Sequence, residues 1–122
     1  MLEQEGYNIM GAAFEVYNTL GSGFLEEVYQ RSLHFELTSR NIPFRSQQEI
    51  TLKYKGITLD KTYFADLVVY DHVIIELKAV SALLPEHAAQ LMNYLKASNL
   101  FIGYLINFGH PNKLEWRRIA LA

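Results

Sequence analysis

The sequence has 122 residues, which is enough for one domain with a sizeable hydrophobic core but too few for two. Half of the residues are apolar and none is cysteine, so a disulfide framework and thiolate-bound zinc or iron–sulfur centres are excluded. The net charge of −2 differs from the basic balance that nucleic-acid-binding proteins normally carry.

Two helices are predicted at the start of the chain. Apolar residues recur at helical spacing over Glu5–Leu20, and Gly21-Ser22-Gly23 ends this helix because glycine adopts the left-handed conformation of a helix cap. A second helix is predicted over Phe24–Arg40, and it ends before Pro43.

After these helices the apolar period changes to two, which is typical of β-strands. The predicted strands are Glu49–Tyr54, Thr62–Val69 and Val73–Ala79. Turns are predicted between them at Lys55-Gly56 and Tyr70-Asp71-His72.

The last part of the chain returns to a helix and then to strands. Pro85 suits the first turn of a helix over Glu86–Ala97. A buried strand is predicted over Leu100–Ile106 and a short edge strand over Trp116–Leu121. The order α-α-β-β-β-α-β-β predicts an α/β fold, a mixed sheet flanked by helices, in a single domain over residues 1–122.

Three charged residues interrupt the apolar strands around the second turn. Asp66, Glu76 and Lys78 stand in a hairpin that is otherwise apolar, where charges are costly unless they are paired or bind a metal. Glu76 and Lys78 are two residues apart and therefore project from the same face of the sheet.

The position of Asp66 depends on the length of that turn. A two-residue turn at Asp71-His72 would place Asp66 opposite Leu77, on the other face. A three-residue turn, Tyr70-Asp71-His72, would pair Val69 with Val73 and set Asp66 opposite Glu76. We predict the three-residue turn.

Two adjacent carboxylates with no sulfur ligand favour Mg²⁺ or Mn²⁺ as the bound ion. Lys78 would then orient a water molecule or neutralise negative charge that develops in the reaction. The alternative is a buried salt-bridge cluster of Asp66, Glu76 and Lys78 without a catalytic role. The spacing by itself favours neither interpretation.

Two helices offer further candidates. Glu26 and Tyr29 share a helical face, where Glu26 would supply a third carboxylate or a base and Tyr29 a substrate contact. Gln90 and Tyr94, at i and i+4, would bind a substrate phosphate. The alternatives are a glutamate that complements the helix dipole, a core aromatic, and a half-buried polar stripe.

Together these motifs resemble the GxxExxY protein family, whose motif stands here as Gly23, Glu26 and Tyr29. The similarity extends over AAFEVYNTLGSGFLEEVYQRSL, ADLVVYDHVIIELKAV, HAAQLMNYLKAS and GYLINFGHPNKL. This family is similar to the PD-(D/E)xK nuclease superfamily, so the resemblance implies one nuclease-like domain with a restriction-endonuclease-like core.

The resemblance also implies roles for single residues. Asp66 matches the first acidic position, and Glu76 and Lys78 match the E-x-K pair. Glu26 matches a glutamate on the helix before the sheet, and Gln90 with Tyr94 resembles a Q-x-x-x-Y motif. One difference is Ala65, which stands where the superfamily name has proline.

Two candidate functions are consistent with these features. The first is a Mg²⁺- or Mn²⁺-dependent nuclease that acts on nucleic acid, with DNA favoured over RNA, and in which a homodimer or a partner protein supplies part of the binding surface. The second is a catalytically silent nucleic-acid-binding or protein-interaction module on the same fold. The start of the chain lacks the basic region of a signal peptide and no apolar run spans a bilayer, so we expect a cytoplasmic protein without a membrane partner.

Overall fold

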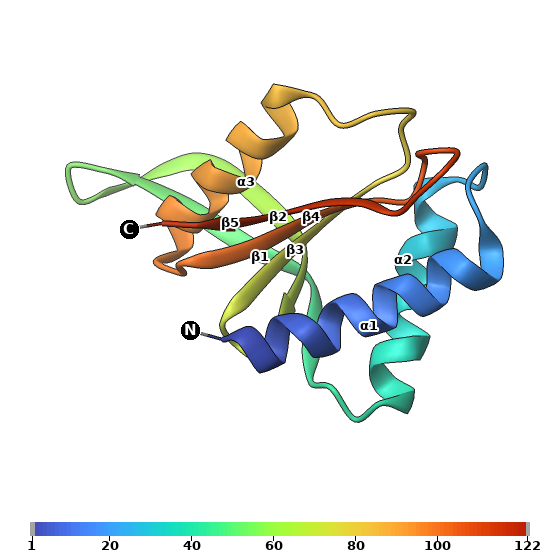
Figure 1. Cartoon of the computed structure of the whole chain (residues 1–122). Helices are drawn as coiled ribbons and strands as arrows, with labels where there is room; N and C mark the ends of the chain where they lie inside the picture. The colour runs from blue at the N-terminus through green and yellow to red at the C-terminus, as the bar shows by residue number, and fades with distance from the viewer. Residues whose placement is uncertain (1, 122) are drawn as a thin grey trace.

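The computed structural model describes residues 2–121 and shows a five-stranded sheet with α1 and α2 on one face and α3 on the other (Figure 1). The elements are α1 (Glu3–Leu20), α2 (Glu26–Ser39), β1 (Phe44–Tyr54), β2 (Ile57–Val69), β3 (Val73–Lys78), α3 (Pro85–Ser98), β4 (Ile102–Asn107) and β5 (Glu115–Ala120). All eight predicted elements are present in the predicted order.

The sheet is mixed, as predicted. Its spatial order is β1-β2-β3-β4-β5, and only β3 and β4 run parallel, with α3 forming the connection between them. Five of the six residues of β3 and all six of β4 are buried, since helices cover both faces of this central pair. β5 is an edge strand, which agrees with its predicted position.

The N-terminal helices are joined by the predicted glycine stop. Gly21 has φ 68° and its N–H donates to the Tyr17 carbonyl at 2.7 Å, which caps α1. The second helix begins at Glu26, two residues later than predicted, because Leu25 still has an extended backbone. This shift matters for the site, since it makes Glu26 the first residue of α2.

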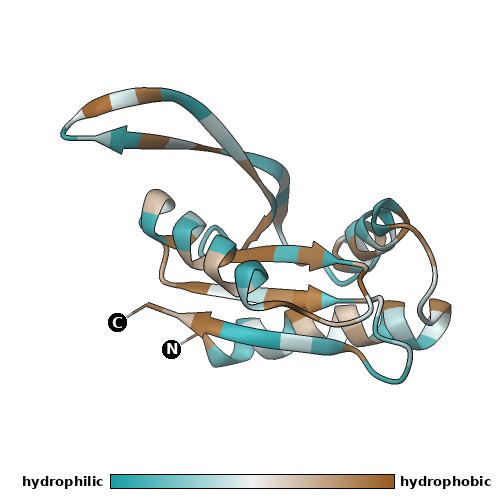
Figure 2. Ribbon diagram, turned by 90° about the horizontal axis from the view of Figure 1, so that it is seen from above, coloured by the Kyte–Doolittle hydropathy of each residue, from teal (hydrophilic) through white to brown (hydrophobic). Residues whose placement is uncertain are grey.

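The hairpin of β1 and β2 is longer than predicted. Each strand begins five residues earlier in the sequence than predicted, β1 at Phe44 and β2 at Ile57. Residues 57–62 are all exposed, so no apolar alternation reveals them, and main-chain pairing with β1 holds them in place. Lys55 (φ 50°) and Gly56 (φ 79°) form the predicted turn. Figure 2 shows the end of this hairpin standing away from the rest of the molecule.

The core has two parts, one on each face of the sheet. Alternate residues of β3 divide between them: Ile75 and Leu77 face α1 and α2, whereas Ile74 faces α3. Glu76 has the same parity as Ile74 and therefore belongs to the α3 side. Among residues 2–121 no helix is both long and apolar enough to cross a membrane.

Candidate metal-binding and nuclease site

The predicted three-residue turn is present and brings the two acidic residues together. Val69 pairs with Val73, and the His72 N–H donates to the Val69 carbonyl at 3.1 Å. Tyr70 and Asp71 both have positive φ, at 56° and 61°, which closes the turn. Leu67 pairs with Ile75, so the next residues in this register are Asp66 and Glu76.

Beyond the Leu67–Ile75 pair, main-chain hydrogen bonds between β2 and β3 are replaced by hydrogen bonds from main-chain N–H groups to the carboxyl groups of Asp66 and Glu76. The Asp66 N–H donates to Glu76 Oε2 at 3.0 Å, and the Leu77 N–H donates to Asp66 Oδ2 at 2.7 Å. Both carboxyl groups therefore sit between the two strands and next to each other. Gln30 of α2 also holds the main chain at Asp66, because its Nε2 donates to the Asp66 carbonyl at 3.2 Å.

Glu76 lies in an unfavourable place for a negative charge. Its side chain is only 5% exposed, and this burial, with the adjacent Asp66 second, raises the pKa of Glu76 to about 9. At neutral pH the carboxyl group consequently keeps its proton in the free protein. Two adjacent carboxyl groups can both ionise at neutral pH only when a cation balances their negative charges. A pair in which one member keeps its proton is therefore the arrangement expected of an empty cation site.

Glu26 and Lys78 lie within electrostatic reach of this pair. Partial burial and then Asp66 raise the pKa of Glu26, and the Lys78 ammonium acts in the opposite direction. Lys78 also lowers the pKa of Glu76, but its side chain makes no ion pair or hydrogen bond with any residue of the range 2–121. It therefore remains available to a ligand.

The three acids do not form a ready-made metal cage. Within the described chain no group of three or more His, Asp or Glu side chains is close enough together to hold an ion. Asp66 and Glu76 are in contact, whereas Glu26 approaches them from the start of α2. The role of Glu26 as a third ligand thus stays a prediction.

Tyr29 has a different position from the one expected of a substrate contact. It is fully buried, its ring is stacked on Phe108 with centroids 4.8 Å apart, and its hydroxyl donates to the Gly21 carbonyl at 2.6 Å. The same hydroxyl accepts a hydrogen bond from the Phe24 N–H at 3.2 Å. This corrects the prediction of a substrate contact: Tyr29 holds the loop that places Glu26 at the start of α2.

Gln90 and Tyr94 face the acidic pair from α3. Gln90 Nε2 donates to the Tyr94 hydroxyl at 3.0 Å, and Tyr94 is 7% exposed. Burial raises the pKa of Tyr94, and the charges of Glu76 and Asp66 raise it further. These two acids act on Tyr94 from across the sheet–helix contact, so the Gln90–Tyr94 pair borders the site, and its role in substrate binding stays a prediction.

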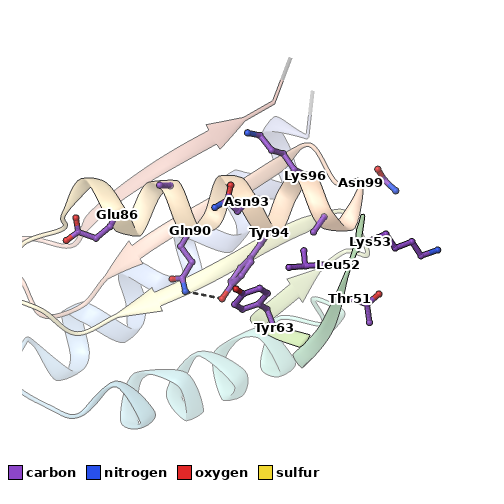
Figure 3. Close-up of a pocket in the computed structure, with 12 residues that line it drawn as sticks. Thr51, Leu52, Lys53, Tyr63, Glu86, Gln90, Asn93, Tyr94, Lys96 and Asn99 are labelled. Atoms are coloured by element: carbon purple, nitrogen blue, oxygen red, sulfur yellow. Dashed lines mark hydrogen bonds between the residues drawn. The ribbon is translucent and has the colours of Figure 1, made fainter. Parts of the chain in front are cut away.

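A groove adjoins this border and was not predicted from the sequence. It has a volume of about 930 Å³ and lies between α3 and the β1–β2 hairpin (Figure 3). Tyr63 lies on its hairpin side, with its ring 5.5 Å from that of Tyr94. Gln30 stands four residues after Glu26 on the same helical face, a spacing from which it could have been predicted, whereas no pattern in the sequence indicates Tyr63.

Asn107 holds the segment that follows Lys78. Asn107 is fully buried; its Oδ1 accepts from the Val80 and Gly109 N–H groups at 3.0 Å each, and its Nδ2 donates to the Val80 carbonyl and to Glu115 at 2.9 Å each. Asn107 is also the register partner of Lys78. It therefore fixes the chain where it leaves β3.

Comparisons with known proteins bear on the family and the fold. Among curated proteins none matches the sequence. The crystal structure of SSO0001 is similar in fold, with a TM-score of 0.58 and 21% identity over 77% of this chain, and the match spans 48% of that protein. A family model described as PD-(D/E)XK nuclease superfamily matches residues 3–119. The α/β fold with a restriction-endonuclease-like core is therefore confirmed, and the chain belongs to the PD-(D/E)XK nuclease superfamily.

Proposed function

We propose that the protein is a metal-dependent nuclease that hydrolyses phosphodiester bonds of nucleic acid, DNA rather than RNA. One observation carries the proposal: Asp66 and Glu76 lie side by side next to the buried apolar segments of β2 and β3, at the point where these strands stop pairing. The cost of burying two adjacent carboxyl groups is offset when a divalent cation binds them.

The donor atoms suit Mg²⁺ or Mn²⁺. Asp66 and Glu76 offer hard oxygen ligands, Glu26 is a third within electrostatic reach, and the sequence has no cysteine that would favour a softer metal. When bound, such an ion lowers the pKa of water and stabilises negative charge on a phosphoryl oxygen.

The remaining residues would act on the substrate directly. The Lys78 ammonium, without a partner among residues 2–121, would neutralise charge that develops on the phosphate or orient the attacking water. Gln90 and Tyr94 would donate hydrogen bonds to a phosphate oxygen. Tyr29 would contribute indirectly, by placing Glu26.

A catalytically silent module on the same fold is the second candidate. Asp66 and Glu76 each accept a main-chain hydrogen bond as they stand, so a protein without metal also satisfies them in part. The net charge of −2 further favours a protein-interaction or weak nucleic-acid-binding module. In either case we propose a cytoplasmic protein of the GxxExxY type in which a second copy or a partner protein adds binding surface.

A cleavage assay separates the two candidates. Plasmid and single-stranded DNA and RNA are incubated with Mg²⁺ or Mn²⁺ and wild type, Lys78→Ala or the matched control Lys113→Ala, whose lysine is exposed between β4 and β5. We expect EDTA to abolish cleavage and Lys78→Ala to slow it roughly 100-fold, whereas the control cleaves normally. Equal cleavage by wild type and Lys78→Ala would remove the catalytic assignment.

A further inference from the structure

The groove beside α3 has walls of two kinds. One wall is β1, which contributes Thr51 and Lys53, and the other is the exposed side of α3, which contributes Asn93 and Lys96. Tyr63 of β2 lies on the hairpin side, beside Tyr94 of α3. Figure 3 shows Lys53 at one end of the groove and Tyr63 beside Tyr94 further along it.

The groove leads to the acidic pair. Tyr63, which lines it, stands three residues before Asp66 in β2, and the charges of Glu76 and Asp66 raise the pKa of Tyr94, which also lines it. Gln90, hydrogen-bonded to Tyr94, lines the same stretch. A strand that enters at Lys53 would thus pass Tyr63 and approach Asp66 along β2.

We propose that this groove binds a single strand of nucleic acid and delivers it to Asp66 and Glu76. The inference rests on the proposed nuclease function and names its substrate class. Aromatic rings beside a positively charged groove are the combination by which proteins bind unpaired strands, and in the lining of this groove Lys53 and Lys96 outnumber the acidic Glu86. Here Tyr63 supplies the ring, and Lys61 lies over that ring with its Nζ 5.6 Å from the centroid.

The chemistry of the walls favours an unpaired strand over a duplex. The amide of Asn93 and the hydroxyl of Thr51 both donate and accept, and they suit the Watson–Crick edges of bases, which are free only in unpaired strands. A volume of about 930 Å³ is that of a pocket for a few nucleotides.

The same chemistry agrees with the unusual charge of the protein. A duplex has a higher density of phosphates, so its binding depends more strongly on basic residues. A net charge of −2 with a few lysines at one groove is compatible with binding in which stacking supplies much of the affinity.

The test measures binding by fluorescence anisotropy in EDTA, where cleavage does not interfere. The probes are labelled oligo(dT), oligo(U) and a blunt DNA duplex; the first two distinguish DNA from RNA as the bound strand. The variants are Tyr63→Leu and Lys53→Gln. Tyr7→Leu, 77% exposed on α1, and Lys113→Gln are the matched controls.

We expect wild type to bind at least one single-stranded probe more tightly than the duplex. Tyr63→Leu should weaken this binding roughly tenfold, and Lys53→Gln should reduce the slope of log K against log salt by about 0.7. Tighter binding of the duplex, or unchanged binding by both groove variants, would overturn the inference. If Tyr63→Leu does not fold, the exposed change Lys96→Glu on α3 serves as the second variant, and it should also weaken binding of the single-stranded probe.

The outcomes also separate this inference from the proposed function. If wild type cleaves with Mg²⁺ or Mn²⁺ but the groove variants bind and cleave single strands normally, the nuclease assignment stands and the groove inference fails. If single strands bind through the groove and neither ion supports cleavage of any substrate, the groove inference stands and the nuclease assignment fails.

Discussion

Asp66 and Glu76 are joined across two strands by a main-chain donor, since the Asp66 N–H donates to Glu76 Oε2 at 3.0 Å. The Asp66 carboxylate in turn accepts from the N–H of Leu77, the residue after Glu76. Each carboxyl group is thus held by the opposite strand. This arrangement keeps two acids together that would otherwise repel each other, and the predictions below concern its consequences.

The first prediction concerns stability and pH. Burial, then Asp66, raise the folded-state pKa of Glu76 from 4.5 to about 9, so between these values the folded protein retains a proton that the unfolded chain has released. The free energy of unfolding should therefore fall as the pH rises through this window. The contribution of Glu76 reaches at most about 1.4 kcal/mol per pH unit.

Urea unfolding of wild type and Glu76→Gln, in EDTA and across this pH window, measures the effect. Glutamine keeps an oxygen that accepts from the Asp66 N–H but does not titrate, so the variant should lose stability less steeply than wild type as the pH rises. Glu15→Gln, an exposed change on α1, should follow wild type. Parallel curves for wild type and Glu76→Gln would show that Glu76 titrates normally.

The second prediction concerns Tyr29. Tyr29→Phe keeps the ring that stacks on Phe108 but leaves the Gly21 carbonyl and the Phe24 N–H without their partner. We expect a loss of about 1–3 kcal/mol in the free energy of unfolding. Tyr7→Phe, at an exposed position, is the control. If both variants were equally stable, the loop before α2 would not depend on the Tyr29 hydroxyl.

The third prediction concerns Asn107. Asn107→Ala removes four hydrogen bonds at a fully buried side chain, to Val80, Gly109 and Glu115, and should cost about 2–4 kcal/mol of unfolding free energy. Asn18→Ala, on the exposed side of α1, should change little. A loss no larger than that of the control would mean that water replaces the Asn107 amide.

Much of the fold could be predicted because its elements have apolar faces. Glu5–Leu20 and Glu86–Ala97 show helical periodicity, and both are helices within two residues of the predicted ends. The turn at Tyr70-Asp71-His72 followed from strand parity, since a one-residue shift would move Asp66 to the other face. The length of this turn and the face of the sheet on which Asp66 lies both depend on residues close together in the sequence, so they could be predicted.

The parts that could not be predicted depend on distant contacts. Residues 57–61 of β2 have no buried face, so only their pairing with β1 reveals them. Tyr29 was placed on the face of Glu26, but its stacking on Phe108 depends on the packing of α2 against a distant part of the chain. The groove near Tyr63 likewise forms only when the hairpin meets α3.

The most direct measurement of the central claim is calorimetric titration of Mg²⁺ and Mn²⁺ into wild type, Asp66→Asn and Glu76→Gln at neutral pH. Binding should be lost in both variants, because each removes one of the two paired carboxylates. Since Glu76 retains its proton in the free protein, wild type should release about one proton per bound ion, as measured in buffers of different ionisation enthalpy. Equal ion binding by wild type and both variants, or no binding by wild type, would contradict a metal site at Asp66 and Glu76.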